Sequence, residues 1–401
     1  MFSCALRSQI SLQIRSFSST SSTSSIKADF THAVIGGGAV GLAIARQLQA
    51  REGASTILIE KHGSVIHASL YYGPTSLKTK LCIRGKEQLY SLCDTHKIPY
   101  NNCGKWIVAQ DATQMDAITK VHEFSKQIGV PTHFLTPAKA KELEPDVRCE
   151  AGVLVSPTTG ILDSHSYMQY LQGSFEDRGG ICSFHSPVVD VKPLNQGSDG
   201  WEIYVQSSPS SSSTSSSEEP TRITASTIIN SAGLYAIPLS NKILPSHRRI
   251  KPFYAKGSYF SYSSSHPSPR TLIYPAPIPG HGGLGTHLTL DMSGRIRFGP
   301  DVEWTDSPSD YTVNSANLQA ALDDIETYLP GVDRGAVEPD YCGIRPKMGR
   351  NSAVAGGKDF QDFHIKMEEE FEGFVNLLAI ESPGLTSSLA IGEEVERLLY
   401  G

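Results

Sequence analysis

A glycine pattern near the start of the chain constrains the fold more than any other feature of the sequence. Residues 33–44 read AVIGGGAVGLAI, with Gly36, Gly38 and Gly41 at G-x-G-x-x-G spacing. A short apolar strand precedes these glycines, and apolar residues follow them at the spacing of a helix. A strand, a glycine turn and a helix in this order predict a βαβ unit that binds a dinucleotide.

Each glycine has a separate role in such a unit. Gly36 permits a tight turn, Gly38 leaves room for a pyrophosphate, and Gly41 lets the helix pack on the strand. The helix offers free backbone N–H groups and the positive end of its dipole to the phosphates. A second strand ends at Glu60, about 20 residues after the last glycine, where a carboxylate accepts hydrogen bonds from an adenosine ribose. These residues alone leave NAD and FAD as alternatives.

The bulk composition describes a folded protein of more than one domain. A chain of 401 residues is long for one simple core, so two domains are expected. The formal net charge of −6, without a basic cluster among aromatic residues, argues against nucleic acid as a partner. The seven cysteines form no C-x-x-C pair and no Cys/His cluster with zinc spacing, so no metal site is predicted.

The first 28 residues differ in kind from the rest. They contain Arg7, Arg15 and Lys27 and many serines, but no acidic residue. Segments of this composition that can form an amphipathic helix are typical of mitochondrial presequences. We therefore expect residues 1–28 to be a presequence or a disordered tail, and the protein to be mitochondrial. No run of residues is long and apolar enough to cross a bilayer, although peripheral membrane contact stays open.

Helix and strand patterns along the rest of the chain predict an α/β fold with two domains. One is a Rossmann-like nucleotide domain assembled from separated segments, and the other is an inserted α+β substrate domain on a mostly antiparallel sheet. The predicted nucleotide domain takes residues 29–75, 151–240 and 340–401. The predicted substrate domain takes residues 76–150 and 241–339. A serine run within residues 206–221 cannot bury surface and is predicted to be a disordered hairpin insertion.

Several longer stretches of the chain resemble one enzyme family. General features are VIGGGAVGLAIA, IINSAGLYA and GIRPK; more specific ones are VIHASLYYGPTSLKTKLC, SPTTGILD, LIYPAPIPGHGGLGTHLTLD, RFGPDVEW and ESPGLTSSLAIG. Together they resemble the FAD-dependent oxidoreductases of the D-amino-acid oxidase and glycine oxidase superfamily, and within it the L-2-hydroxyglutarate dehydrogenases. The resemblance runs from Ala33 nearly to the C-terminus, and it favours FAD over NAD.

The resemblance implies which residues hold FAD. The SAG stretch at 231–233 passes close to the pyrophosphate, and the strand near Val189 borders the adenine. A helix that begins at Pro383 lies under the flavin, with its N–H groups toward the ring edge where negative charge develops. The implied cofactor-binding residues are Gly36, Gly38, Ala39, Val40, Gly41, Glu60, Lys61, Val189, Ser231, Ala232, Gly233, Pro383, Gly384, Leu385 and Thr386.

The reaction implied is oxidation of L-2-hydroxyglutarate to 2-oxoglutarate by hydride transfer to flavin N5, with electrons passed to a quinone or another respiratory acceptor. Such a substrate needs a cation for its carboxylates and a base for its hydroxyl proton. Arg345 matches the carboxylate-binding position and can bind bidentately, and Lys347 is a candidate for the distal carboxylate. His67 and His287 are alternative bases. The implied catalytic residues are His67, His287 and Arg345, and the implied substrate-binding residues are Arg345, Lys347, Tyr72 and Tyr274.

One departure from the family pattern bears on this function. The family carries a longer stretch before VIHA, with a Ser-Arg-Asn-Ser-like element beside FAD. In this chain only the four residues KHGS lie between Glu60 and Val65. The short loop has three interpretations: a splice or gene-model artefact, a shortened loop with function kept, or an FAD-deficient pseudoenzyme. Two further alternatives are an amino-acid or amine oxidase of the same superfamily and, last, an NAD-dependent dehydrogenase.

Overall fold

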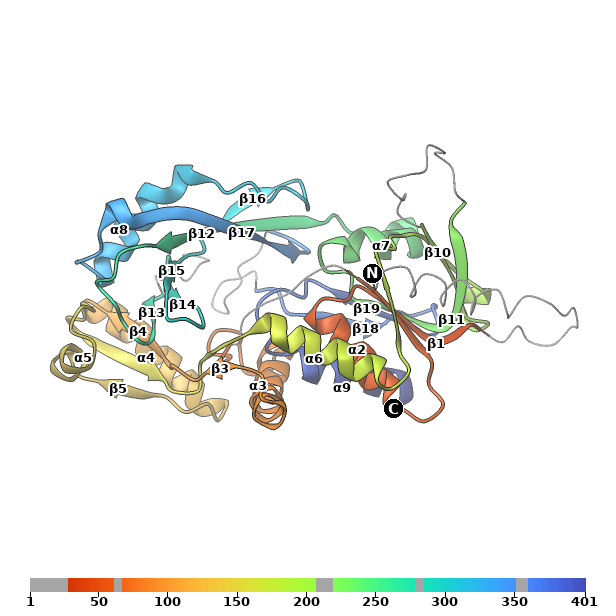
Figure 1. Cartoon of the computed structure of the whole chain (residues 1–401), viewed down its shortest axis with the longest axis horizontal. Helices are drawn as coiled ribbons and strands as arrows, with labels where there is room; N and C mark the ends of the chain where they lie inside the picture. Colours follow the sequence, from red (N-terminus) through yellow and green to blue (C-terminus); the bar gives the residue numbers. More distant parts are fainter. Residues whose placement is uncertain (1–27, 61–66, 207–218, 278–284, 351–359) are drawn as a thin grey trace, which may run out of the picture.

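The computed structural model describes residues 28–60, 67–206, 219–277, 285–350 and 360–401. Two sheets lie toward opposite ends of the long axis of the molecule (Figure 1). In these ranges, no helix combines the length and the apolar character that a membrane crossing requires. The predicted presequence, most of the serine-rich insertion and the short loop after Glu60 lie outside the described residues.

The first sheet contains the predicted βαβ unit. In the described part of the chain it has eight strands, in the order β18-β19-β11-β1-β2-β8, with β10 paired to β11 and β9 paired to β10. Neighbouring strands from β19 to β8 are parallel, whereas β18, β10 and β9 pair antiparallel. The strands are β1 (Phe30–Ile35), β2 (Thr56–Glu60), β8 (Ile181–Phe184), β9 (Val188–Pro193), β10 (Trp201–Val205), β11 (Thr221–Asn230), β18 (His364–Met367) and β19 (Phe374–Leu378).

Four helices cover one face of this sheet and share one apolar core with it (Figure 1). The helix after the glycine loop packs against the last helix of the chain, and these two bury their apolar stripes together. A parallel sheet needs such cover, because its strands are apolar on both faces. The helices are α2 (Ala39–Gln49), α3 (Leu77–His96), α6 (Ser164–Glu176) and α9 (Ser388–Tyr400), and α7 (Ala236–Ile243) packs near β9 and β19.

The second sheet is mostly antiparallel, as predicted. The described residues give it nine strands in the order β16-β12-β15-β14-β13-β4-β6-β5, with β17 paired to β12; only the pair β13 and β4 is parallel. Its strands are β4 (Lys105–Ala109), β5 (His133–Leu135), β6 (Gly152–Ser156), β12 (Phe253–Tyr262), β13 (Leu272–Pro275), β14 (Leu288–Leu290), β15 (Ile296–Phe298), β16 (Glu303–Thr305) and β17 (Val337–Lys347). Its helices are α4 (Ala112–Gln127), α5 (Pro137–Leu143) and α8 (Leu318–Tyr328).

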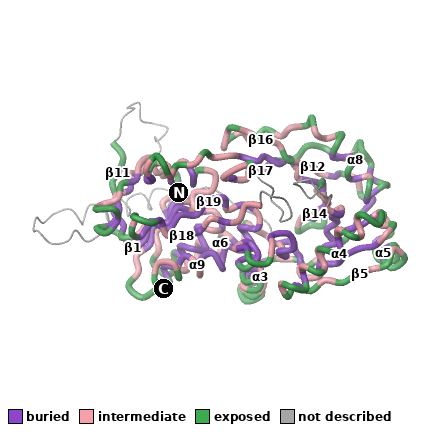
Figure 2. Tube along the Cα trace, turned by 180° about the vertical axis from the view of Figure 1, so that it is seen from behind, coloured by how far each residue is buried: buried purple, intermediate pink, exposed green. Residues whose placement is uncertain are grey.

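Smaller elements connect the two sheets. A two-stranded sheet pairs β3 (Tyr100–Asn101) with β7 (Ile161–Leu162). Figure 2 shows that buried residues follow the strands and the helices packed on them, while exposed residues follow the outer loops and helix faces. Short 3-10 helices lie at Asn195–Gly197, Gly233–Tyr235, Ser246–Arg248, Ser315–Asn317 and Arg334–Ala336.

Three segments pack with a different sheet from the one that the predicted domain boundaries imply. Helix α3 falls in the predicted substrate domain, yet it packs on α9 and buries Leu81 and Leu89 in the core of the first sheet. Strand β6 lies within the predicted nucleotide domain and β17 ends within it, yet both strands pair in the second sheet. An apolar stripe predicts that a helix is covered, but it does not specify which sheet covers it. The division into domains otherwise stays a prediction.

Two helical glycines test how closely α3 packs on the chain before α9. A Cβ on Gly85 would lie 2.3 Å from the carbonyl oxygen of Thr386, whereas a Cβ on Gly173 of α6 would meet nothing within 4 Å. Alanine favours a helix over glycine by about 0.5–1 kcal/mol, but overpacking costs typically about 1–3 kcal/mol. We therefore expect Gly85→Ala to lower the midpoint of thermal unfolding and Gly173→Ala to keep or raise it. Equal shifts in the two variants would contradict this packing.

Candidate active site

The glycine loop folds as a dinucleotide loop requires. Gly36 has a φ of 103°, which glycine adopts readily, and a Cβ there would lie 2.3 Å from the carbonyl oxygen of Ser231. A Cβ on Gly41 would lie 1.7 Å from the carbonyl oxygen of Gly36. Gly38 is the N-cap of α2 and gives no side-chain cap to its first N–H groups. Ala39 and Val40 follow as the first residues of α2, so the loop fits a pyrophosphate at the helix start.

The SAG stretch after β11 holds the glycine loop in place. The Ser231 hydroxyl lies within hydrogen-bonding distance of the carbonyl oxygens of Ile35 and Gly36, at 3.0 and 2.9 Å. Asn230, which the sequence analysis missed, donates to Asn376 Oδ1 at 2.9 Å and so ties β11 to β19. Ala232 and Gly233 follow, the latter with a φ of 56°. The predicted SAG residues therefore lie beside the loop, and their contact with FAD stays a prediction.

Two further predicted cofactor residues, Glu60 and Val189, lie in strands of the first sheet. Strand β2 ends at Glu60, as predicted, and Lys61 lies outside the described residues. Val189 lies in β9, and its carbonyl oxygen accepts a hydrogen bond from Lys242 at 2.9 Å. Its predicted place beside the adenine stays a prediction.

The segment before α9 differs from the predicted helix. Residues 382–387 form turns, and α9 begins at Ser388 rather than Pro383. The N–H of Gly384 donates to the carbonyl oxygen of Glu381 at 2.5 Å, so this N–H is used within the turn and does not open a helix. Thr386 accepts a hydrogen bond from the backbone N–H of His67 at 2.5 Å, which places His67 against this segment. Leu385 is buried in the core beneath it.

The two predicted histidines lie in one site with Arg345. Burial, followed by the positive charges of Lys105 and Arg345 and by His287, lowers the pKa of His67 to about 3. Burial likewise lowers the pKa of His287 to about 3, with Arg345 and Lys105 acting in the same direction. Both imidazoles are therefore neutral near pH 7, and each can accept a proton.

The hydrogen bonds of the two histidines differ. His67 Nε2 lies 2.8 Å from the Ser382 hydroxyl. His287 Nδ1 lies 3.1 Å from the carbonyl oxygen of Gly285. A carbonyl oxygen only accepts hydrogen bonds, so Nδ1 must be the donor. This contact assigns the proton to Nδ1 and leaves Nε2 as an acceptor. The His287 ring also stacks on Tyr274, with centroids 3.9 Å apart and planes 18° apart, so Tyr274 fixes its orientation.

Arg345 presents a charged guanidinium to the site. It lies on β17 opposite Ala255, with 35% of its side chain exposed, and its Nη1 is 4.0 Å from Glu381 Oε2. Burial would lower its pKa, but Glu381, Tyr259 and Tyr72 outweigh burial and raise the pKa above its ordinary value. Tyr72 is itself buried, and burial raises the pKa of its hydroxyl, so it stays protonated.

Lys347 occupies a different environment from the one predicted. It is 3% exposed, and its Nζ donates to Glu381 Oε1 at 2.6 Å. Lys78 Nζ donates to the same oxygen at 3.0 Å, and neither side chain of that pair is exposed. Burial would raise the pKa of Glu381, but these two ammonium groups and Arg345 hold it below its ordinary value. Lys347 therefore belongs to a buried ion cluster formed by Lys78, Lys347 and Glu381.

Sequence reasoning missed Lys105, the first residue of β4. The side chain is 4% exposed, and burial lowers its pKa to about 7. Its position could have been found in the sequence, because a single lysine precedes the apolar run WIVA in a strand that reads as fully buried.

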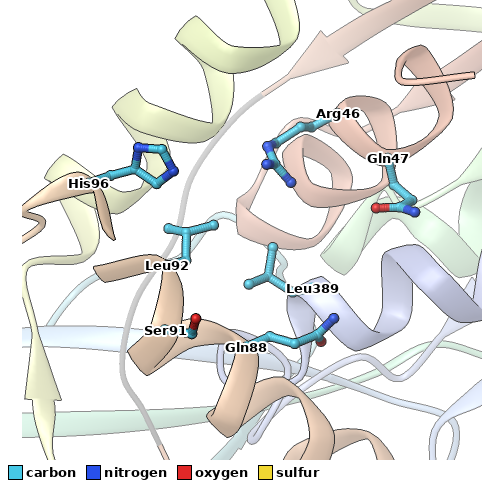
Figure 3. Close-up of a pocket in the computed structure, with 7 residues that line it drawn as sticks. All are labelled: Arg46, Gln47, Gln88, Ser91, Leu92, His96 and Leu389. Carbon is cyan, nitrogen blue, oxygen red and sulfur yellow. The ribbon is translucent and has the colours of Figure 1, made fainter. Parts of the chain in front are cut away.

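A separate cavity lies on the outer face of the helices (Figure 3). It has a volume of about 240 Å³ and contains none of the predicted site residues. The residues that line it come from α2, α3 and α9: Arg46, Gln47, Gln88, Ser91, Leu92, His96 and Leu389.

The ion cluster gives a test of stability. Glu381→Gln leaves two buried ammonium groups without their carboxylate, so we expect a loss of about 3–5 kcal/mol and a lower midpoint of thermal unfolding. Because the pKa of Glu381 is depressed, the difference from wild type should be full above about pH 4.3 and shrink as the pH falls below it. Glu393→Gln, which breaks an exposed pair with Arg84, is the control and should change little. Equal effects of the two changes would refute the role of the cluster.

Comparison with known proteins assigns the chain to a family. Residues 32–398 match the family of FAD-dependent oxidoreductases. The chain is similar to the mitochondrial L-2-hydroxyglutarate dehydrogenase of Arabidopsis thaliana, with 36% identity over 90% of this chain and 82% of that protein. It is also similar to the mitochondrial L-2-hydroxyglutarate dehydrogenase of Nematostella vectensis, with 32% identity over 90% of this chain and 89% of that protein.

Solved structures of low sequence identity share the fold. L-α-glycerophosphate oxidase from Mycoplasma pneumoniae, solved with FAD bound, has a TM-score of 0.78 at 20% identity and covers 93% of this chain and 95% of its own. Glycine oxidase from Bacillus cereus has a TM-score of 0.72 at 17% identity and covers 92% and 97%. These similarities confirm the predicted fold class, and the family match selects FAD over NAD. The chain belongs to the FAD-dependent oxidoreductases.

Proposed function

We propose that this protein oxidises L-2-hydroxyglutarate to 2-oxoglutarate. The observation that carries the proposal is that a charged arginine and two neutral histidines, all partly buried, share one site beside the turn before α9. A 2-hydroxy acid needs these two functions, a cation for its carboxylate and a base for its hydroxyl proton. Two relatives that share about a third of their residues with this chain are named for this substrate.

Each side chain has a defined task in this proposal. Arg345 binds the carboxylate next to the reacting carbon and fixes the orientation of the hydroxyl group. His67 or His287 accepts the hydroxyl proton on its imidazole, and both stay candidates because both rings are neutral near pH 7. Tyr274 holds the His287 ring by stacking, and Tyr72 forms part of the buried wall. Bound FAD supplies the hydride acceptor for the hydrogen on the same carbon.

The charge of the site favours a hydroxy acid over an amino acid. Lys105 and Arg345 both act on the pKa values of the two histidines, so the site is cationic. An amino-acid substrate brings an ammonium group, which these cations repel, whereas a dicarboxylate brings two negative charges. An oxidase that uses an amino acid is therefore the less favoured alternative.

We also propose a mitochondrial location and a quinone or another respiratory acceptor for the electrons. The location rests on the basic, serine-rich character of residues 1–28 and on two relatives that are named mitochondrial. The acceptor rests on the resemblance alone.

A visible absorption spectrum of the purified protein tests the function directly. We expect a flavin band that bleaches when L-2-hydroxyglutarate is added without oxygen, because hydride transfer reduces the ring. The D-isomer is the control and should leave the band unchanged. A colourless protein that stays colourless with added FAD would favour the FAD-deficient alternative, in which the short loop before Val65 has removed cofactor binding.

Replacement of the proposed carboxylate anchor tests the site. We expect Arg345→Met to keep FAD but to raise KM and lower kcat/KM by roughly 100-fold, because a charged contact to the substrate is lost. Arg297→Met is a matched control, since Arg297 lies in the same sheet with 34% of its side chain exposed and pairs with Asp340. Unchanged kinetics in the Arg345 variant would remove the anchor.

A further inference from the structure

Lys105 carries a buried amino group that lacks an acceptor, and a bound anion would favour its protonated form. Within the described ranges, no hydrogen bond or ion pair joins its amino group to another residue, and the residue is only 4% exposed. Its Nζ lies instead over two aromatic rings, 4.8 Å from the centroid of Tyr71 and 4.7 Å from that of Tyr274. Aromatic faces compensate a buried ammonium only in part, so its full stabilisation requires an anion.

A second unpartnered polar group lies beside Lys105. In the part of the chain that the structure describes, the buried Tyr71 hydroxyl has no hydrogen-bond partner. Burial raises the pKa of this hydroxyl well above its ordinary value, so it stays protonated and can donate a hydrogen bond. The amino group of a residue that is 4% exposed and a fully buried hydroxyl, neither with an acceptor among the described residues, together define a site for an anionic or strongly polar ligand.

The other charged groups around this point leave the position open to a carboxylate. Arg345 is the neighbouring cation, and His67 and His287 are neutral. Glu381 is the nearest acid to Arg345, but it is engaged by Lys78 and Lys347, so Lys105 receives no carboxylate from it. Lys347, the residue that the sequence suggested for the distal carboxylate, is engaged in the same cluster.

We propose that Lys105, together with the Tyr71 hydroxyl, binds the second carboxylate of a dicarboxylate substrate, while Arg345 binds the first. The inference rests on the proposed function, and it specifies how the site selects its substrate class. A 2-hydroxy monocarboxylate leaves the ammonium of Lys105 buried without a counter-ion, whereas a 2-hydroxydicarboxylate neutralises it. Lys105 is thus a specificity-determining residue that contacts the end of the substrate farther from the hydroxyl group.

Two substrates of equal chain length test this assignment. L-2-Hydroxyvalerate has the five-carbon chain of L-2-hydroxyglutarate but a methyl group in place of the second carboxylate. In the FAD-loaded enzyme, Lys105→Met should lower kcat/KM for L-2-hydroxyglutarate by roughly 10- to 100-fold, because one charged contact is lost. It should raise kcat/KM for L-2-hydroxyvalerate relative to that for L-2-hydroxyglutarate, because methionine removes an ammonium group that has no counter-ion beside the methyl end. An equal fall in kcat for both substrates would overturn the inference and assign Lys105 to proton transfer.

A binding measurement separates this inference from the proposed reaction. Glutarate has both carboxylates but no hydroxyl group, so its binding does not depend on turnover. Calorimetric titration of the holoenzyme should show that Lys105→Met lowers the affinity for glutarate roughly 10-fold or more. Tyr71→Phe should lower this affinity less, and Lys105→Arg should keep part of it. Equal glutarate affinity in wild type and Lys105→Met would overturn the inference. Failure of wild type to oxidise L-2-hydroxyglutarate would instead refute the proposed function.

The flavin spectrum and the midpoint of thermal unfolding control for misfolding. Lys105 has no hydrogen-bond or ion-pair partner in the described part of the chain, and methionine can still pack on the rings of Tyr71 and Tyr274. Its replacement by Met should therefore leave both nearly unchanged, whereas loss of a structural ion pair would lower the midpoint. Lys78→Met is the contrasting variant, because Lys78 is fully buried in the ion cluster with Glu381. A fall in stability after Lys105→Met as large as that after Lys78→Met would identify Lys105 as structural and overturn the inference.

Discussion

The arrangement of the site depends on one buried carboxylate. Glu381 accepts hydrogen bonds from Lys78 of α3 and Lys347 of β17, so it ties a helix of the first sheet to the longest strand of the second. Arg345 lies two residues before Lys347 on that strand, and its guanidinium lies 4.0 Å from the same carboxylate. Because Glu381, Lys78 and Lys347 are buried, their charges interact strongly, and removal of one partner would leave the others uncompensated.

The same carboxylate fixes the segment that contacts His67. Ser382 follows Glu381 directly, and its hydroxyl lies 2.8 Å from the His67 imidazole. Thr386 then accepts the N–H of His67, so the turn before α9 holds both the ring and the backbone of this histidine. Structural charge and candidate chemistry are therefore adjacent in the chain. The ion cluster uses its cations within the protein, while Lys105 and Arg345 are the cations proposed to bind the substrate.

Much of the fold could be predicted because its signals are local. The N-cap Ser76 before α3, the Pro at the start of α5 and the N-cap Asp163 before α6 are all visible in the sequence and all lie where the helices begin. The start of α9 was predicted at Pro383 and lies at Ser388. Pro-Gly is typical of a helix start, but here the N–H of Gly384 donates to the carbonyl oxygen of Glu381 and closes a turn. The helix pattern in the sequence does not predict this hydrogen bond.

The sequence by itself determined the cofactor loop, the α/β class and the family, because glycine spacing and apolar periods act over short distances. It also supplied His67, His287 and Arg345 as candidates. Only the tertiary structure distinguished the roles of the lysines. Lys347 is a substrate candidate in the sequence, but in the structure it pairs with Glu381. Lys105 begins strand β4, and among the described residues its amino group has no hydrogen-bond or ion-pair partner. The physical reason is that charge pairing and burial join residues hundreds of positions apart, and no local pattern records them.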